Sequence, residues 1–489
     1  MRAAAARIRI VRHVRIRPAL FGVLLLAACH GSDRPSNPAA TGALPARADA
    51  FPVADATVTG PVTGGIHGHP LWDSWYDLGA LGYVEEEYFI SGQARVQPGG
   101  AEAAYTTRII VTRPRDAAGF SGTVMLDWVN VTAQFENPVD TLEAHDFLLR
   151  EGWAYVFVSA QSAGVCCAPE LTPKMWDPVR YMRLNHPGDD WSFDLFAQVA
   201  RAVRAPVGTD PMGGLKVERV LAAGQSQSAD RLYSYVNLGY ARSGVIDGFL
   251  IHGGGEKHFD QTPAAPVIHL LSDREAAAAA PASYGNYSLW EIAGSSHTDL
   301  YVGWHQVGGQ SQRALADAPQ QPASADPGLH VVAANYGEQL HPLLGVCIVA
   351  GSAFPTRYAV KAALSQLDHW ARTGERPPDG PRFEFDASGA LVPDEHGNTR
   401  GGIRYPVVDV PVARYASTVC PLGGITIPFT DAQIAALYPT HADYFCKMKA
   451  AAARTVAAGF LLPADADELM ARVEGAANRF SAAGVRDCN

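Results

Sequence analysis

A strand, a tight turn and a helix are predicted in succession between Val217 and Leu238, and this stretch constrains the fold more than any other. The run from Val220 to Ala223 is apolar and indicates a buried strand, and the residues after the turn carry apolar side chains at helical spacing. The turn itself reads Gly224-Gln225-Ser226-Gln227-Ser228. A serine in such a turn, with very small residues two positions away on each side, is typical of a nucleophile elbow. Ser226 is therefore a candidate nucleophile.

The second small residue of the turn is Ser228, so the pattern is G-x-S-x-S and not the commoner G-x-S-x-G. Serine still meets the steric requirement, because only a bulky side chain at this position would strike the preceding strand. An ordinary strand-to-helix loop is the alternative interpretation of the same residues. The catalytic hypothesis therefore depends on partners downstream.

A nucleophilic serine needs a base to take its proton and an acid to orient that base. The strand after the elbow is predicted at 245–251. Two further apolar strands are predicted beyond it, at 266–271 and 287–293, and each of these two is followed by titratable residues. Asp273 and Glu275 follow the first strand, and His297 follows the second. This is the chain order serine, acid, histidine that accompanies a nucleophile elbow. We prefer Glu275 as the acid, because it lies a few residues beyond the strand, and Asp273 is the alternative acid.

The oxyanion formed during ester attack needs N–H donors. We expect one at the backbone of Gln227, directly after the nucleophile. The other is expected in the loop after the strand predicted at 122–131, with Asn130 and Val131 as the candidates. For Asn130 a simple turn residue is the competing interpretation.

Four other histidines compete with His297 for a role. His269 lies inside a predicted strand and is expected in the core, whereas His252 and His258 follow the strand after the elbow and could line a pocket. His305 lies further on. A second Gly-Gln-Ser-Gln, at 309–312, repeats part of the elbow, but no buried strand precedes it, so we assign it to a loop.

The remaining pattern is that of an α/β protein. Fully apolar strands alternate with helices, which favours a mostly parallel central sheet covered by helices on both faces. Helices are also expected at 142–151, 191–204 and 355–372, and a helical C-terminal region at 441–458 and 464–479. Thr430 and Gln433 form a predicted capping box.

The N-terminus has the features of a bacterial lipoprotein signal. Six arginines and no acidic residue precede an apolar run that ends at Leu26-Ala27-Ala28-Cys29. We therefore expect 1–28 to be a signal peptide, Cys29 to be lipidated, and 29–54 to be a flexible tether. The rest, 55–489, is expected to be one domain with cap insertions at about 164–190 and 301–342.

Charge and cysteine usage limit the possible partners. The net charge is -10, and it becomes -16 once the six N-terminal arginines are removed, so nucleic-acid binding is not expected. Six cysteines remain after Cys29, and export would permit disulfides among them. Cys420 with Cys446 is one pairing considered, and Cys166 and Cys167 are considered to pair either with each other or with cysteines elsewhere. No C-x-x-C occurs, and no metal or organic cofactor is expected.

Five segments together resemble a family of large bacterial α/β-hydrolase domain proteins. They are GQSQSADRL, NHPGDDWSFDLFAQ, SDRE, EIAGSSHTD and HGNTRGGIRYPVVDVPVARY. The resemblance extends over nearly everything from about residue 55 onward, and in this family the elbow is usually G-x-S-Q-S. It implies the α/β-hydrolase fold, with Ser226 as nucleophile and His297 as base. The resemblance also implies that the acid is Asp273 or Glu275. The segment that contains these two residues generally ends in Asp in the family, whereas in this chain it ends in Glu.

These observations predict an exported serine hydrolase, lipid-anchored at the bacterial cell envelope, that cleaves a carboxylic ester through an acyl-enzyme, in the manner of a carboxylesterase. The expected partners are a small or polymeric ester substrate and the membrane that holds the anchor. A peptidase or amidase with the same triad is one alternative. A non-catalytic surface lipoprotein that uses the fold as a binding module is the other.

Overall fold

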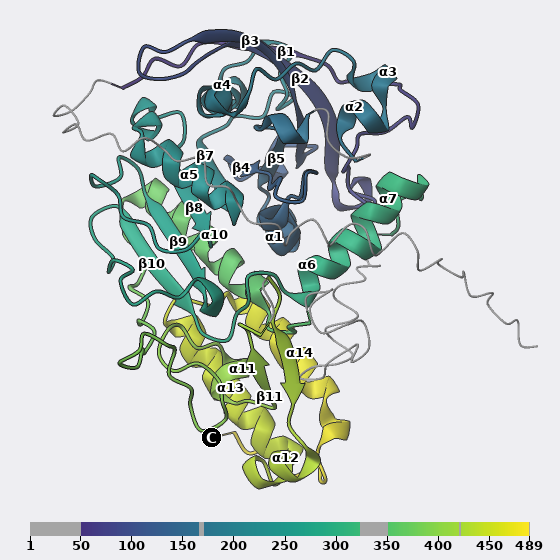
Figure 1. Cartoon of the computed structure of the whole chain (residues 1–489). Helices are drawn as coiled ribbons and strands as arrows, with labels where there is room; N and C mark the ends of the chain where they lie inside the picture. Colours follow the sequence, from purple (N-terminus) through teal and green to yellow (C-terminus); the bar gives the residue numbers. More distant parts are fainter. Residues whose placement is uncertain (1–49, 166–170, 323–350, 420–421, 489) are drawn as a thin grey trace, which may run out of the picture. The chain divides into compact units, whose positions relative to one another are not determined.

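A ten-stranded sheet runs through the centre of the structure, a computed structural model that describes residues 50–165, 171–322, 351–419 and 422–488. The strand order is β10-β9-β8-β7-β4-β5-β3-β2-β1-β6 (Figure 1). The strands are β1 (Thr57–Thr59), β2 (Tyr83–Arg95), β3 (Glu102–Pro114), β4 (Thr123–Trp128), β5 (Ala154–Val158), β6 (Val207–Gly208), β7 (Arg219–Gln225), β8 (Gly248–His252), β9 (Val267–Ser272) and β10 (Tyr287–Ile292).

Six neighbouring strands of the sheet, β10, β9, β8, β7, β4 and β5, run parallel to one another. The pairs β5–β3, β3–β2 and β2–β1 are antiparallel. Every residue of β4, β5 and β8 is buried, as expected for parallel strands covered on both faces. In the register, Ala222 of β7 lies opposite Leu126 of β4 and Phe249 of β8. The strand that precedes Ser226 is therefore an inner strand with parallel neighbours on both sides.

Helices cover both faces of the sheet, which confirms the predicted architecture. The long helices beside the sheet are α1 (Val139–Arg150), α4 (Ser192–Arg204), α5 (Gln227–Asn237) and α10 (Thr356–Thr373). Side chains of α4 and α5 share one hydrophobic core with one face of the sheet, and side chains of α1 and α10 share a second core with the other face. The parallel strands all end at the same edge, so residues that follow them meet there.

The C-terminal region is helical, as predicted, and packs into the core that contains α10. Its elements are α11 (Pro406–Asp409), β11 (Ala413–Ala416), β12 (Ile425–Pro428), α12 (Asp431–Leu437), α13 (His441–Ala457) and α14 (Pro463–Gly475). The capping box of Thr430 and Gln433 is present at the start of α12.

One disulfide joins Cys446 of α13 to Cys488 near the C-terminus. The pairing of Cys446 with Cys420 that we considered is therefore wrong. The C-terminal segment returns along the start of α13, where His441 and Ala442 donate their backbone N–H groups to Ala482 and Ala483, and this brings Cys488 close to Cys446. Cys29, Cys166, Cys167, Cys347 and Cys420 lie outside the described residues.

Short helices occupy the described parts of the two expected insertions. They are α2 (Pro173–Trp176) and α3 (Pro178–Tyr181) in the first, and α6 (Leu300–Trp304), the π-helical segment η9 (His305–Gln310) and α7 (Ser311–Ala316) in the second. Residues 166–170 and 323–350 lie outside the described residues, so the role of both insertions as caps stays a prediction. Single turns of 3-10 helix lie at η3 (Gly79–Leu81), η4 (Ala117–Gly119), η5 (Ser162–Gly164), η6 (Asp189–Trp191), η7 (Tyr240–Ser243), η8 (Asp273–Glu275) and η10 (Ala477–Arg479).

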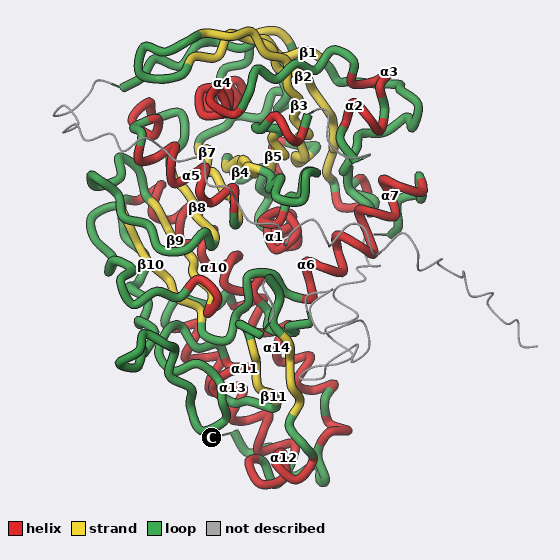
Figure 2. The backbone as a smooth tube through the Cα atoms, in the orientation of Figure 1, coloured by secondary structure: helices red, strands yellow, loops and turns green. Residues whose placement is uncertain are grey.

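The second Gly-Gln-Ser-Gln is helical, so its assignment to a loop was wrong (Figure 2). Gly309 lies directly against the ring of Trp75, where a Cβ would come within 2.7 Å of the indole. Ala314, one turn further on, is buried. Tertiary packing of this kind stabilises a helix that glycines would otherwise disfavour. Ser311 begins α7 and follows no strand, so it does not form a second elbow.

The described residues lie in one compact unit, Pro45–Asn489. Within the described parts of the chain, none of the helices combines the length and the apolar character that crossing a bilayer requires. The signal peptide and the tether expected at 1–54 lie almost entirely outside the described residues.

Candidate active site

Ser226 occupies a strained turn between β7 and α5. Its backbone has φ 62° and ψ -117°, a conformation that non-glycine residues rarely adopt. The Ser226 N–H donates to the carbonyl of His252 at the end of β8, at 2.8 Å, and this bond fixes the turn to the neighbouring strand. A Cβ at Gly224 would lie 3.0 Å from Cβ of Ser228, so the first small residue of the elbow is required by this close approach.

Three side chains from separate strand ends form one hydrogen-bonded chain. Nε2 of His297 lies 2.8 Å from Oγ of Ser226, and Nδ1 of the same ring hydrogen-bonds Oε1 of Glu275. His297 follows β10, and Glu275 closes the single turn η8 after β9. The three side chains are separated by tens of residues in sequence, and the parallel sheet brings them together at one edge.

The carboxylate of Glu275 is held from two sides. Its Oε2 accepts hydrogen bonds from the backbone N–H, at 2.9 Å, and the hydroxyl of Ser272, within a capping box. Burial alone would raise the pKa of Glu275, but the hydrogen bond and the charge of His297 outweigh it and lower this pKa. The carboxylate is therefore ionised at neutral pH and can stabilise a positive charge on the imidazole.

Asp273, the alternative acid, does not hydrogen-bond His297. Its buried carboxylate accepts bonds from the N–H of Gly294 at 3.1 Å and from the hydroxyls of Thr399 and Ser417 at 2.7 and 2.6 Å. Burial raises the pKa of Asp273 to about 6. This carboxylate thus joins the loop that carries His297 to the C-terminal region.

The candidate oxyanion donors differ in whether their N–H groups already donate a hydrogen bond within the protein. Gln227 is the first residue of α5, and an N–H at this position has no acceptor within its own helix. The backbone N–H of Asn130 donates to Asn137 at 3.0 Å, and its side-chain amide donates to the carbonyl of Gln225 at 3.0 Å. In the described residues the backbone N–H of Val131 has no hydrogen-bond partner. Asn130 therefore ties the β4 loop to the elbow, and its role as a donor stays a prediction.

Gln225, the residue before Ser226, contacts His297. Its side-chain amide donates to the carbonyl of His297 at 3.0 Å and lies 3.4 Å from Nε2 of the imidazole. We did not single out this residue from the sequence. Side chains alternate along a strand, so Gln225 faces the side of the sheet opposite to that of Gly224. This position was the signal available in the sequence.

A second imidazole–carboxylate pair lies beside the elbow. Nδ1 of His252 is 2.9 Å from Oδ1 of Asp140, a fully buried residue in the first turn of α1. His252 also accepts the backbone hydrogen bond of Ser226, and Gly253 lies against Glu275, since a Cβ there would be 3.4 Å from its Oε1. The sequence suggested His252 as a pocket residue but gave no sign of Asp140. The pair connects α1, the helix that follows the Asn130–Val131 loop, to the strand end that contacts Ser226.

The other three candidate histidines have surroundings of their own. His269 is fully buried between the hydroxyl of Tyr287 and the carbonyl of Gly253, and burial lowers its pKa to about 3, so it is neutral as a core residue should be. His258 is exposed. His305 is buried in η9 beside Trp75.

One group of carboxylates in the described chain has the spacing of a metal site. Oxygens of Asp146, Asp465 and Glu468 lie within 4.8 Å of one another. The buried ammonium of Lys361, however, lies 2.9 Å from Asp146 and 2.6 Å from Asp465, and Arg357 pairs with Glu468 at 2.8 Å. These cations already neutralise the carboxylates, so the cluster is a set of ion pairs.

Comparison with known proteins identifies the family. The model of an alpha/beta hydrolase domain family matches residues 58–471. No curated protein matches the chain. Similar solved structures include a proposed dienelactone hydrolase from Klebsiella pneumoniae, at 15% identity and TM-score 0.24, which overlaps 50% of this chain and 95% of its own. XC6422 from Xanthomonas campestris, a serine hydrolase without a lid, has 16% identity and TM-score 0.27, over 47% of this chain and 97% of its own.

A glucuronoyl esterase from Solibacter usitatus is similar at 9% identity and TM-score 0.26, over 46% of this chain and 70% of its own. The match to the family model is much more extensive than any of these overlaps. It includes the elbow, both strand ends that carry titratable residues, and most of the C-terminal region. On this match, the chain belongs to the alpha/beta hydrolase domain family and has its fold.

Proposed function

We propose that this protein is a serine hydrolase that cleaves a carboxylic ester through an acyl-enzyme. One observation carries the proposal, namely the unbroken hydrogen-bond chain from Glu275 through His297 to the hydroxyl of a strained Ser226. A serine hydroxyl is a weak nucleophile until a base removes its proton, and an imidazole oriented by a carboxylate is such a base.

In the proposed reaction, Oγ of Ser226 attacks the ester carbonyl while Nε2 of His297 takes its proton. The backbone N–H of Gln227, with a donor from the Asn130–Val131 loop, holds the resulting oxyanion. His297 then gives the proton to the leaving alcohol, and the acyl group stays on Ser226. Water attacks this acyl-enzyme, His297 takes the proton of the water, and the acid is released as Ser226 recovers its own proton.

An assay that pairs esters with amides tests the proposed function. We expect the full chain to hydrolyse p-nitrophenyl esters from acetyl to dodecanoyl, with a preference for one range of acyl length. Matched p-nitroanilides should be cleaved far more slowly. Comparable rates on the anilides would instead make the protein an amidase or peptidase, and no turnover of either series would favour a binding module.

Replacing His252 with alanine is expected to lower kcat for the ester about 100-fold with little change in KM, because small displacements of reacting groups have effects of this size. The ring is the anchor by which Asp140 holds the strand end against the elbow. Steady-state kinetics check this, and the exposed His258→Ala serves as the matched control. Asp140→Asn, which can still accept from Nδ1, should retain more activity than Asp140→Ala. An unchanged kcat in His252→Ala would remove the positioning role.

We further propose that the protein is exported and lipid-anchored through Cys29. Support comes from the arginine-rich segment, the short apolar run and the Leu-Ala-Ala-Cys sequence, and a disulfide between Cys446 and Cys488 fits an oxidising compartment. Radiolabelled palmitate should enter the wild-type protein expressed in a bacterium and should not enter Cys29→Ser. Equal labelling of both proteins would contradict the anchor.

A further inference from the structure

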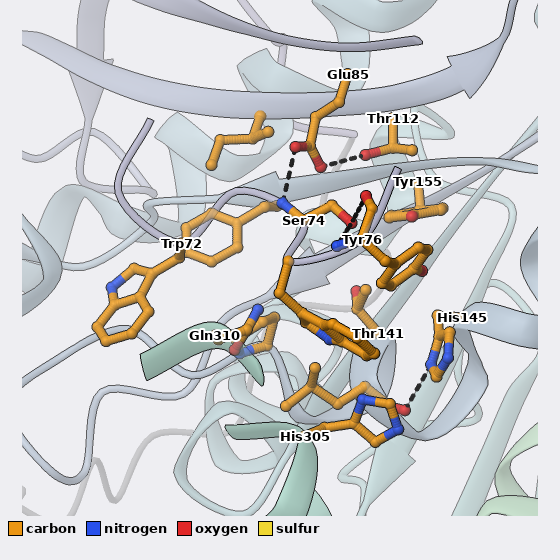
Figure 3. A pocket seen from close by; sticks show the side chains of 15 residues that line it. Trp72, Ser74, Tyr76, Glu85, Thr112, Thr141, His145, Tyr155, His305 and Gln310 are labelled. Carbon is orange, nitrogen blue, oxygen red and sulfur yellow. Dashed lines mark hydrogen bonds between the residues drawn. The ribbon is translucent and has the colours of Figure 1, made fainter. Parts of the chain in front are cut away.

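A cavity separate from the triad lies between the sheet, α1 and η9. Its walls come from β2, β3 and β5, from the N-terminal part of α1, from the loop at 72–76 and from η9, and none of the triad residues lines it (Figure 3). The volume open to the centre of a water-sized sphere is about 50 Å³. A cavity of this volume has room for a few waters or a small organic molecule of similar size.

Aromatic rings make up much of the wall. Trp72, Trp75 and Tyr76 come from the loop at 72–76, and Tyr155 and Phe157 from β5. Trp75 and Tyr76 meet edge to face, with ring centroids 4.9 Å apart. Rings of this kind attract cations through the negative charge of their faces, and the attraction grows when the cation is shielded from water.

Glu85 is the acidic residue in this wall. Figure 3 places it with Thr112 on one side of the cavity and His145 and His305 on the opposite side. Its Oε1 accepts from the N–H of Ser74 at 2.8 Å, and its Oε2 accepts from the hydroxyl of Thr112 at 3.0 Å. Both partners are neutral. The carboxylate thus has hydrogen bonds but no positively charged partner in contact.

No cationic side chain of the described chain forms an ion pair with Glu85. The guanidinium of Arg313 is the cation that most affects it electrostatically, but Arg313 is held by Asp73 through contacts of 2.8 to 3.1 Å. Burial, followed by the charge of Asp73, raises the pKa of Glu85 to about 7. Glu85 is part-buried and has no counter-ion in contact, so a cation in the cavity would stabilise its ionised form.

We propose that this cavity binds a small organic ammonium ion, with its charge against Glu85 and its methyl groups against the aromatic wall. The size of the cavity fits an ion of about five non-hydrogen atoms, and aromatic walls with one carboxylate favour a methylated ammonium over a strongly hydrated metal cation. The site is independent of Ser226, since the two share no lining residue.

The proposed binding depends on pH in a defined direction. Glu85 must be ionised to attract the ammonium, so binding weakens as the pH falls through about 7. His145 and His305 lie on the opposite wall, and Arg313 and Asp73 are paired with each other. The ratio of affinities at pH 8 and pH 6 is expected to be about ten, because the fraction of ionised Glu85 changes by this factor.

Isothermal titration of the full chain with tetramethylammonium chloride at pH 8 tests the proposal. tert-Butanol, which has the same number of non-hydrogen atoms but no charge, is the matched ligand. We expect the ammonium ion to bind at least about tenfold more tightly than tert-butanol. Glu85→Gln should abolish this preference, whereas Glu86→Gln should keep it, because Glu86 is paired with Arg113 and does not line the cavity.

Two further measurements keep the proposal open to contradiction. Ser226→Ala should bind tetramethylammonium like the wild type, so that loss of ester hydrolysis and loss of cation binding can be told apart. If Glu85→Gln does not fold, the pH series on the wild-type protein replaces it. Absence of binding, equal affinity for tert-butanol, or an affinity that is the same at pH 6 and pH 8 would overturn the proposal.

Discussion

Ser226→Ala is expected to lower kcat for ester hydrolysis by roughly 10⁴- to 10⁶-fold, with the fold intact. The substitution removes only the hydroxyl group of Ser226. The proposed mechanism has no substitute for this group, because the neighbouring Gln227 offers only its backbone to the reaction. Any residual rate reflects the oxyanion donors acting on water. Steady-state kinetics with the best p-nitrophenyl ester provide the measurement, and circular dichroism and thermal unfolding check the fold.

Ser228→Ala is the matched control for this variant. Ser228 lies two residues further on, is fully buried, and its hydroxyl has no hydrogen-bond partner among the described residues. Alanine also satisfies the steric limit set by Gly224. Ser228→Ala should therefore keep kcat within about threefold of wild type. A normal rate in Ser226→Ala, or an equal loss in both variants, would refute the assignment of the nucleophile.

Glu275→Gln is expected to reduce kcat about 10³- to 10⁴-fold, because a neutral amide neither stabilises the imidazolium nor fixes the productive tautomer of His297. The lowered pKa of Glu275 means that the wild-type carboxylate is present throughout the neutral range. Its contribution to stability is present above its unfolded pKa and is lost as the pH falls through the lower folded pKa. The reduction in kcat should accordingly be seen at every pH from 6 to 9.

Asp273→Asn is the paired variant that decides between the two acids. Asp273 hydrogen-bonds Gly294, Thr399 and Ser417, so its replacement should mainly loosen the histidine loop and lower the unfolding temperature. We expect kcat to fall by no more than about tenfold. A larger loss of kcat in Asp273→Asn than in Glu275→Gln would make Asp273 the acid.

Much of the candidate site could be predicted because its signals are local. The elbow is a strand, a turn and a helix within about twenty residues, and its small residues follow from sterics. The parallel sheet then supplies a rule for distant partners, since residues after β9 and β10 must meet Ser226 at one edge. His297 could be found in this way. The rule located two carboxylates after β9, and spacing alone did not separate Asp273 from Glu275.

Other features depend on contacts that no local pattern encodes. Asp140 and His252 are separated by 112 residues and meet because α1 packs against β7, the neighbour of β8 in the sheet. Cys446 pairs with Cys488 because the C-terminal segment returns along α13, and cysteine spacing carries no trace of that return. The helix at 309–312 owes its stability to Trp75 packing on Gly309, which overrides the low helix propensity of glycine.

The most direct test of the central claim is covalent labelling of the folded full chain with a fluorophosphonate probe, followed by mass spectrometry of its peptides. The probe reacts only with a serine that a neighbouring base has activated. We predict one label, on the peptide that contains Ser226, and its loss in His297→Ala. A folded protein that takes up no probe, or that takes it up at another serine, would contradict the proposal that Ser226, His297 and Glu275 work together as a catalytic triad.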